Sequence, residues 1–169
     1  MPKIIENLRV RLVEEARRQA LTEGYAAMTV RSVAAACGVG VGTLYNYFPN
    51  KDVLTATFML EDWERAMDAV REPGADAPAA AARRIYDALL TYAADHAPVI
   101  RDAGAGGLPA AMPRYHAMLR AQLAEPLRRF CGDDFTAEFI AEALLTWTMA
   151  GKDFDEIYGL IERLFVKEN

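Results

Sequence analysis

The segment that most constrains how this chain can fold is GVGVGTLYNYFPNK, residues 38–51. Glycine occupies three of its first five positions, and glycine weakens helices and strands because it loses more conformational entropy on folding than other residues. Apolar residues recur at helical spacing on both sides of this segment. Two tyrosines and an asparagine in its second half are poorly suited to a core. We therefore interpret the segment as a tight turn followed by a short helix with one outward face.

The remainder of the sequence predicts an all-α fold of about nine helices. Alanine is abundant and β-branched residues are sparse, which favours helix over strand. Pro126 is expected to kink or split the helix in which it lies, because proline removes a backbone donor and clashes with the preceding turn. The apolar spacing predicts helices over about 4–22, 30–37, 41–47, 51–71, 79–96, 110–130, 134–150 and 153–167.

Short-range chemistry predicts several helix ends. Thr29 is a plausible cap for the second helix, because its hydroxyl can accept a hydrogen bond from the backbone N–H of Arg31 or Ser32. Gly38 can adopt the left-handed conformation that ends this helix. Asn50 can cap the helix that begins at the next residue.

Two segments predict breaks between helices. PGADAP (73–78) has the composition of a linker. Pro98 is expected to interrupt the helix that follows this linker. GAGGLP (104–109) predicts a second flexible break, either a surface loop or a gate. These breaks separate the amino-terminal helices from those of the carboxy-terminal half.

The charge of the chain is unevenly distributed. The net charge of −5 over 169 residues argues against a nucleic-acid ligand for the protein as a whole. Residues 1–51, however, carry seven basic and four acidic residues, whereas the remainder carries 12 basic and 20 acidic ones. A mildly basic head on an acidic body suits a protein whose head alone meets an anion, unless the asymmetry is accidental.

Composition also indicates the cellular compartment in which the protein resides. The 53% hydrophobic and 25% charged residues are typical of a globular chain. Cys37 and Cys131 form no metal-spaced pair, and the sequence has no secretory segment and no apolar run of about 18 residues. We expect a reduced, cytoplasmic protein without a membrane partner.

A rotation of about 100° per residue divides the short helix into two faces. Val41, Leu44 and Phe48 share an arc that can pack on the preceding helices, with Tyr45 at its edge. Val39 can fill the gap at the turn. The opposite arc carries small, hydroxyl and amide groups from Gly42, Thr43, Asn46 and Tyr47.

That outward arc suits the major groove of DNA. Gly42 permits close backbone approach, Thr43 can meet a thymine methyl or a phosphate, and Asn46 can pair with adenine. Tyrosine hydroxyls can reach phosphates, and Arg31 and Lys51 add flanking cations. A helical hairpin with a glycine turn and surface tyrosines would show the same pattern.

Specific residues favour the first interpretation. The glycine–aromatic pair Gly24-Tyr25, the run Thr29-Val30-Arg31 and the segment GVGVGTLYNYFPNKDVL (38–54) stand in this order. Residues 12–56 with these motifs resemble the DNA-binding domain of TetR-type transcriptional regulators. The motifs cover roughly the first third of the chain, and beyond them only the order and lengths of the helices are similar.

The resemblance implies a homodimer whose recognition helices enter the major grooves of a palindromic operator. It further implies a helix-turn-helix head of three helices at 1–51 and a helical ligand-binding and dimerisation body at 52–169. Helix 41–47 has no Arg or Lys, so a bidentate arginine–guanine contact must come from Arg31 or is not made at all. By position, base or nearby backbone contacts are implied for Arg31, Val41, Gly42, Thr43 and Tyr47, and phosphate contacts for Thr29, Tyr45 and Lys51.

Apolar stripes on the last two helices predict a dimer interface. Two adjacent striped helices fit a four-helix interface built from both subunits, although each stripe can also pack on its own core. The stripes comprise Phe135, Phe139, Ile140 and Leu144, then Phe154, Ile157, Tyr158, Ile161, Leu164 and Phe165.

Large amphipathic side chains on the middle helices are candidates for a ligand pocket. Such residues line sites for small apolar or aromatic ligands, but they also form ordinary cores. The candidates are Met59, Trp63, Tyr86, Tyr92, His96, Met112, Tyr115, Met118 and Trp147.

No catalytic or metal-binding pattern is apparent. His96 and His116 lack partners at the i, i+4 spacing of a helical metal site. Asp95 cannot orient its neighbour His96, because adjacent helical residues point to different faces. No phosphate loop or nucleophile motif is present, so we expect neither an enzyme nor a cofactor.

We therefore predict a ligand-released repressor of the TetR type. Two alternatives stay open. One is a DNA-binding regulator without a small-molecule ligand, controlled by a protein partner or by its abundance. The other is a helical protein-interaction module that does not bind DNA.

Overall fold

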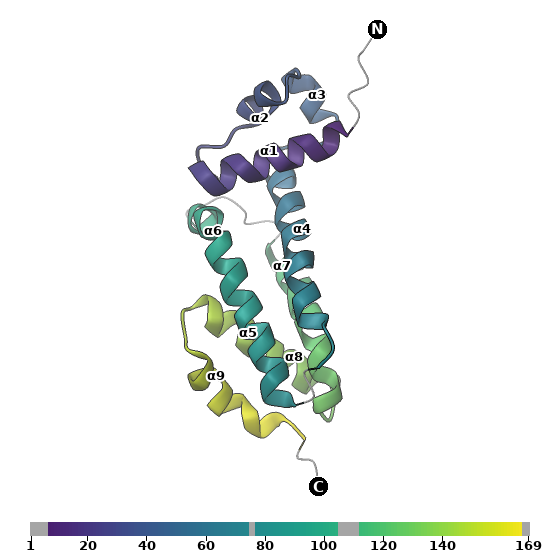
Figure 1. Cartoon of the computed structure of the whole chain (residues 1–169), viewed down its shortest axis with the longest axis vertical. Helices are drawn as coiled ribbons and strands as arrows, with labels where there is room; N and C mark the ends of the chain where they lie inside the picture. The colour runs from purple at the N-terminus through teal and green to yellow at the C-terminus, as the bar shows by residue number, and fades with distance from the viewer. Residues whose placement is uncertain (1–6, 75–76, 105–111, 167–169) are drawn as a thin grey trace. The chain divides into compact units, whose positions relative to one another are not determined.

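The computed structural model describes residues 7–74, 77–104 and 112–166, and over these ranges it is all-helical (Figure 1). The predicted fold class is confirmed. In chain order the elements are α1 (Leu8–Glu23), α2 (Val30–Ala36), α3 (Val41–Tyr45), α4 (Lys51–Arg71), α5 (Pro78–Asp95), α6 (Ala97–Gly104), α7 (Met112–Ala124), the 3-10 helix η1 (Glu125–Phe130), α8 (Asp134–Met149), α9 (Phe154–Ile161) and the 3-10 helix η2 (Glu162–Leu164).

The predicted helix ends are largely confirmed. Thr29 accepts a 3.0 Å hydrogen bond from the backbone N–H of Ser32, and Asn50 accepts one of 2.8 Å from that of Val53. The helix around Pro126 is split as expected, since α7 ends at Ala124 and η1 follows directly.

Helix α6 was not predicted. Pro98 does end the preceding helix, but it is also the second residue of α6, where its missing N–H would have no helical partner. The next two backbone N–H groups, of Val99 and Ile100, both donate to the carbonyl of His96. Proline thus begins one helix where the sequence suggested only an interruption. The break predicted at 104–109 lies outside the described residues from 105 onward.

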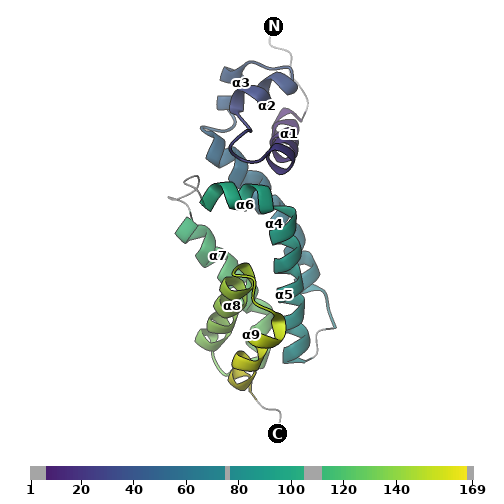
Figure 2. The same cartoon turned by 90° about the vertical axis from the view of Figure 1, so that its left-hand side faces the viewer.

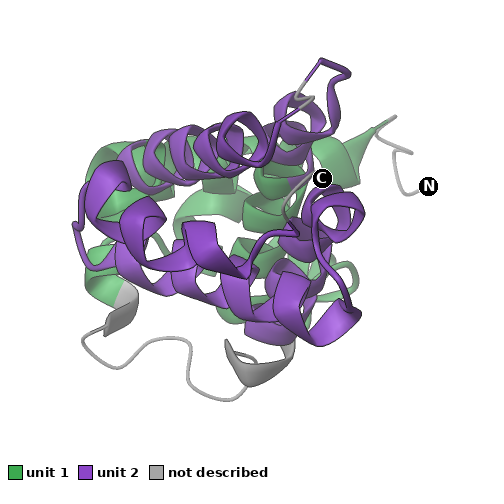
Figure 3. Cartoon of the chain, turned by 90° about the horizontal axis from the view of Figure 1, so that it is seen from below, with its two compact units in different colours: residues 1–63, 95–109 green, residues 64–94, 110–169 purple. Residues whose placement is uncertain are grey.

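The chain forms two compact units (Figure 3). The first comprises residues 1–63 and 95–109, and the second comprises 64–94 and 110–169. The first unit therefore extends beyond the head proposed at 1–51, because it also contains the first part of α4 and all of α6.

The first unit has a core of aliphatic and aromatic side chains. Leu12 of α1, Leu44 of α3 and Phe58 of α4 are fully buried, and Val99 of α6 belongs to the same cluster. Burying each such side chain stabilises the fold by roughly 1.5–3 kcal/mol. This core fixes the orientation of the short helix α3.

The second unit packs α5, α7, α8 and α9 around another core (Figure 2). Leu89, Leu123 and Leu144 are fully or almost fully buried there, and α7 lies beside α8. The rings of Tyr86 and Phe154 meet edge to face at 5.5 Å between centroids. No helix within the described ranges is long and apolar enough to cross a membrane.

Candidate nucleic-acid interface

The turn between α2 and α3 depends on one glycine. Gly38 has a φ of 71°, in the left-handed region that L side chains rarely adopt. The N–H of Gly38 donates to Ala35 and that of Val39 to Ala34, which closes the end of α2. Gly40, at the other end of the turn, has a φ of −73° and a ψ of 150°, which suit any residue.

The inward face of α3 is the predicted one. Leu44 and Phe48 are buried, whereas Val41 is partly buried and packs against the same cluster, as does Val39 at the turn. Burial of this face orients the other side of α3 toward solvent.

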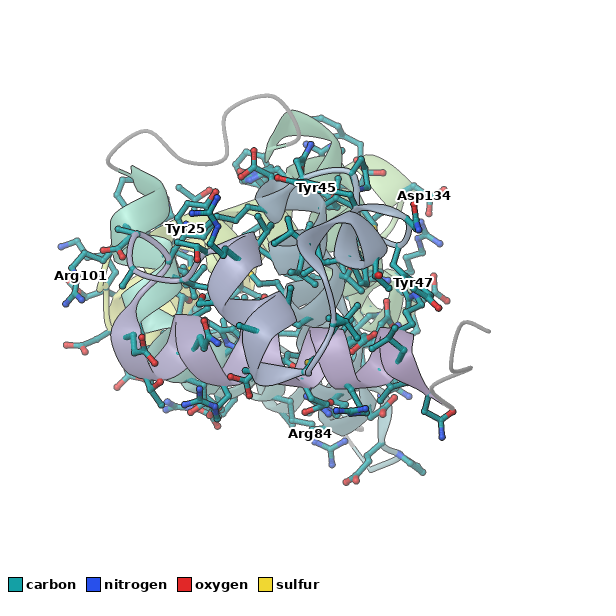
Figure 4. All side chains as sticks on the ribbon, turned by 90° about the horizontal axis from the view of Figure 1, so that it is seen from above. Tyr25, Tyr45, Tyr47, Arg84, Arg101 and Asp134 are labelled. Atoms are coloured by element: carbon teal, nitrogen blue, oxygen red, sulfur yellow. The ribbon has the colours of Figure 1, made fainter. Side chains whose placement is uncertain are left out.

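The outward face of α3 is accessible and chemically available. Tyr45 and Tyr47, labelled in Figure 4, are 48% and 45% exposed. Gly42 and Asn46 are exposed, and Thr43 is partly exposed. Within the residues that the structure describes, no side-chain hydrogen bond is made by Thr43, Tyr45, Asn46 or Tyr47.

Gly42 has no role in the packing of its own chain. Its φ lies outside the left-handed region, and a Cβ atom built on it would meet nothing within 4 Å. The fold would accommodate alanine at this position, and alanine is also the better helix former. The sequence thus keeps a bare backbone on the exposed side of α3 without an intramolecular reason.

Two cations, Arg31 and Lys51, stand before and after α3 in the sequence. Arg31 on α2 is exposed and makes no ion pair or side-chain hydrogen bond within residues 7–74, 77–104 and 112–166. Lys51 is partly buried, with Nζ 4.0 Å from the centroid of the Tyr25 ring. Burial lowers the pKa of Lys51, and the carboxylates of Asp52 and Asp102 oppose that shift. Thr29 is exposed, but its hydroxyl is engaged in the cap of α2.

Two cations of α1, by contrast, are neutralised within the unit. Arg17 pairs with Glu14, with Glu61 at 2.9 Å and with Asp62 at 3.0 Å. Arg18 pairs with Glu15 at 2.7 Å. Among the basic residues of the head, Arg31 and Lys51 are therefore better placed than these two to meet an external anion.

A buried pair that sequence spacing did not reveal lies in the same unit. His96 Nε2 is 2.8 Å from Asp62 Oδ2, and the opposite oxygen of Asp62 is 3.0 Å from Arg17 Nε. Asp102, which follows His96 closely in the sequence, instead accepts a 3.0 Å hydrogen bond from the N–H of Ala26. His96 is thus part of an ionic network that joins α1 and α4 to the start of α6.

The candidate pocket residues are distributed over both units. In the first unit, Trp63 and His96 are buried and Met59 is partly buried. In the second, Tyr86 is buried and donates to the carbonyl of Lys152 at 3.1 Å. The side chain of Met112 lies outside the described residues, and the partly buried members of the second unit are Tyr92, Tyr115 and Met118.

Trp147, the last of the candidate pocket residues, lies at the surface. It is half exposed on α8 and lines an apolar groove of about 640 Å³, which we call the α8–α9 groove. The groove also contains Leu160, 80% exposed, and Ala143, two residues that the sequence did not single out. The complete lining is Phe139, Ala143, Trp147, Lys152, Glu156, Ile157, Leu160, Ile161 and Leu164.

The predicted dimer residues divide into two groups. Phe135 and Phe139 of α8 and Leu164 of η2 are exposed, and Tyr158 is partly buried. The remaining six are buried within their own chain, although Ile157 and Ile161 also line the α8–α9 groove: Ile140, Leu144, Phe154, Ile157, Ile161 and Phe165.

A three-helix head with a turn at Gly38 and an unpartnered outward face on α3 defines a helix-turn-helix protein. Residues 12–56 match the model of the bacterial regulatory proteins of the tetR family. Residues 12–56 are therefore similar to the amino-terminal domain of the tetR family.

Known proteins agree with this assignment. Over 65 residues the chain is 32% identical to the HTH-type transcriptional regulator UidR of Escherichia coli strain K12, a match that covers 38% of this chain and 33% of UidR. The chain thus spans about a third of the length of this curated relative.

Two solved structures share the fold. RolR in complex with resorcinol is 19% identical, with 96% of this chain and 89% of RolR covered at a TM-score of 0.70. The multidrug binding protein EbrR complexed with imidazole is 21% identical, with 98% of both chains covered at a TM-score of 0.68. At these identities the likeness concerns the fold alone.

Proposed function

We propose that this protein is a DNA-binding transcriptional regulator that binds a palindromic operator as a homodimer and acts as a repressor. The observation that carries the proposal is the outward face of α3. Its hydroxyl and amide groups have no partners within the described residues, and buried Leu44 and Phe48 hold the helix beneath them. Polar groups held in this way are suited to base edges and phosphates.

The contacts follow from the chemistry of each group. Gly42 lets the DNA backbone or a base edge approach closely. Thr43 can contact a thymine methyl group, and Asn46 can pair with adenine. Arg31 is an exposed cation near α3 without an ion pair inside the described ranges, and is therefore the candidate for a guanine contact. With no cation on α3 itself, specificity depends partly on thymine methyl groups and on DNA shape.

A second copy of the chain is the partner proposed for the α8–α9 groove. Phe139, Trp147 and Leu160 expose large apolar surfaces there, and apolar patches of this kind on soluble domains mark interfaces. Because a two-fold interface uses the same patch on both subunits, burying this groove would pair the two heads symmetrically. Two recognition helices about 34–36 Å apart would then match one turn of DNA.

Release by a small apolar or aromatic ligand completes the proposal. Support comes from the fold shared with RolR, solved with resorcinol, and with EbrR, solved with imidazole. A ligand of this kind lowers the affinity of the dimer for its operator by some factor. By linkage, the DNA-bound dimer must then bind the ligand less tightly by the same factor.

Titration of DNA tests the regulator directly. Labelled duplexes from upstream of the protein's own gene are mixed with the full chain, and binding is followed at several salt concentrations. Saturable binding that weakens steeply with salt is expected, because cationic side chains displace counterions from phosphates. Absent or salt-insensitive binding to every genomic fragment overturns the proposal.

A further inference from the structure

Lys51 does not extend freely from the start of α4. Its ammonium nitrogen lies 4.0 Å from the centroid of the Tyr25 ring, well inside the range of a cation–π contact. Tyr25 belongs to the loop between α1 and α2, whereas Lys51 is the first residue of α4. A contact between segments 26 positions apart therefore fixes the end of a long, flexible side chain.

The Tyr25 ring is itself held in place. Its hydroxyl donates a hydrogen bond to Oδ1 of Asp52, the residue that follows Lys51. The next backbone N–H in the loop, of Ala26, donates to Asp102 of α6 at 3.0 Å. The ring also packs against the buried cluster of the first unit. The surface on which Lys51 rests is thus anchored from α4, α6 and the core.

We propose that Tyr25 is a positioning residue for DNA binding, which holds the Lys51 ammonium where a backbone phosphate reaches it. This inference rests on the proposed function. A free lysine side chain loses rotamer entropy when it is ordered. Ordering it on the ring before DNA arrives removes part of that cost from binding. The ring covers one side of the ammonium and leaves N–H donors on the other side for phosphate oxygens.

Asp52 completes the arrangement in two ways. It fixes the Tyr25 hydroxyl, and its negative charge favours the protonated form of the partly buried Lys51. Removing only the hydroxyl should therefore loosen the ring without removing the cation–π contact. Tyr25→Phe is expected to have a smaller effect on DNA binding than Tyr25→Leu.

A double-mutant cycle on an operator duplex tests the inference with the whole chain. The variants are Tyr25→Leu, Lys51→Met and the double variant, with Kd and its salt dependence as readouts. Lys51→Met should reduce the salt slope by about one for each phosphate that Lys51 neutralises. Tyr25→Leu should raise Kd by roughly fivefold and reduce the slope in the same direction, because the cation–π contact that holds the ammonium is lost in both subunits.

The background of Lys51→Met separates positioning from packing. If Tyr25 acts through Lys51, Tyr25→Leu changes Kd by less than about a factor of two once Lys51 is absent, since the ring then has no ammonium to hold. Equal weakening in both backgrounds, or no effect in either, overturns the inference while leaving the proposed function intact. Failure of the unaltered protein to bind DNA overturns both.

Two controls keep the outcome interpretable. Arg128→Met removes a cation that pairs with Glu125 in the second unit and does not line the α8–α9 groove, and it should leave the salt slope unchanged. The melting temperature and helix content of each variant report folding. If Tyr25→Leu does not fold, Tyr25→Phe in the two Lys51 backgrounds gives the same test at smaller amplitude.

Discussion

His96 Nε2 lies 2.8 Å from Asp62 Oδ2, and both side chains are buried in the first compact unit. The same carboxylate receives Arg17 of α1 at 3.0 Å. Arg17, Asp62 and His96 of the first unit are thereby joined through one buried carboxylate. Because a buried charge is costly unless it is paired, each partner depends on the others.

Asp62→Ala should therefore destabilise the protein by about 3 kcal/mol, since it leaves Arg17 and His96 without their shared anion. Equilibrium urea unfolding measures the change. Glu61→Ala is the matched control, because Glu61 also pairs with Arg17 but is exposed, and it should cost less than about 1 kcal/mol. Equal losses for the two variants would contradict the assigned role of the network.

Gly42→Ala should separate folding from DNA binding. A Cβ at this position meets nothing within the chain, so the fold should lose no stability and gain up to about 1 kcal/mol of helix propensity. DNA affinity should fall by roughly tenfold, equivalent to about 1.4 kcal/mol, because the methyl group stands between α3 and DNA. Thermal unfolding and fluorescence anisotropy measure the two effects.

Gly38→Ala is the opposite control. Its φ of 71° strains any L side chain, so this variant should lose about 1 kcal/mol of stability. An unchanged DNA affinity for Gly42→Ala would show that this face of α3 does not approach DNA.

The dimer proposal predicts a specific dependence on Leu160. Leu160→Asp places a charge in the α8–α9 groove and should convert dimers to monomers at micromolar concentration, because burying an unpaired charge is costly. Sedimentation equilibrium measures the molar mass. Leu90→Asp alters a large exposed residue of α5 that does not line the groove, and it should leave the mass unchanged. If the Leu160→Asp variant still dimerises with undiminished affinity between its subunits, the interface lies elsewhere.

The raised pKa of Tyr25 predicts that the folded protein loses stability at high pH. Burial first, and then the hydrogen bond and charge of Asp52, raises the pKa of Tyr25 to about 12. An unfolded tyrosine ionises near pH 10, so this stabilisation is complete below about pH 10 and is lost as the pH rises toward 12. The free energy of unfolding should fall more over this window for the unaltered protein than for Tyr25→Phe. Parallel curves would show that Tyr25 does not carry the shift.

The sequence predicted best the features that local chemistry determines. The caps at Thr29 and Asn50, the split at Pro126 and the buried face of α3 depend on residues within a few positions of each other. The pairing of His96 with Asp62 spans 34 positions, and no helical spacing encodes it.

Helix α8 shows why an apolar stripe does not identify an interface. Its apolar residues occupy more than one side, so Ile140 and Leu144 pack inward while Phe139 and Trp147 face solvent. From the sequence, Trp147 was placed among the pocket candidates. Phe139, Ile140 and Leu144 were predicted to belong to one dimer interface. Only the fold separates the core side of α8 from its exposed side.

Selection of bound duplexes from random DNA tests the central claim most directly. The unaltered protein should enrich a palindrome whose half-sites are centred about 10–10.5 base pairs apart or a multiple of that distance. Asn46→Ala and Arg31→Ala should each relax the preference at one symmetric pair of positions, at a cost of about 1–3 kcal/mol per contact. No enrichment, or an identical motif from all three proteins, would contradict the role assigned to α3 and its flanking arginine.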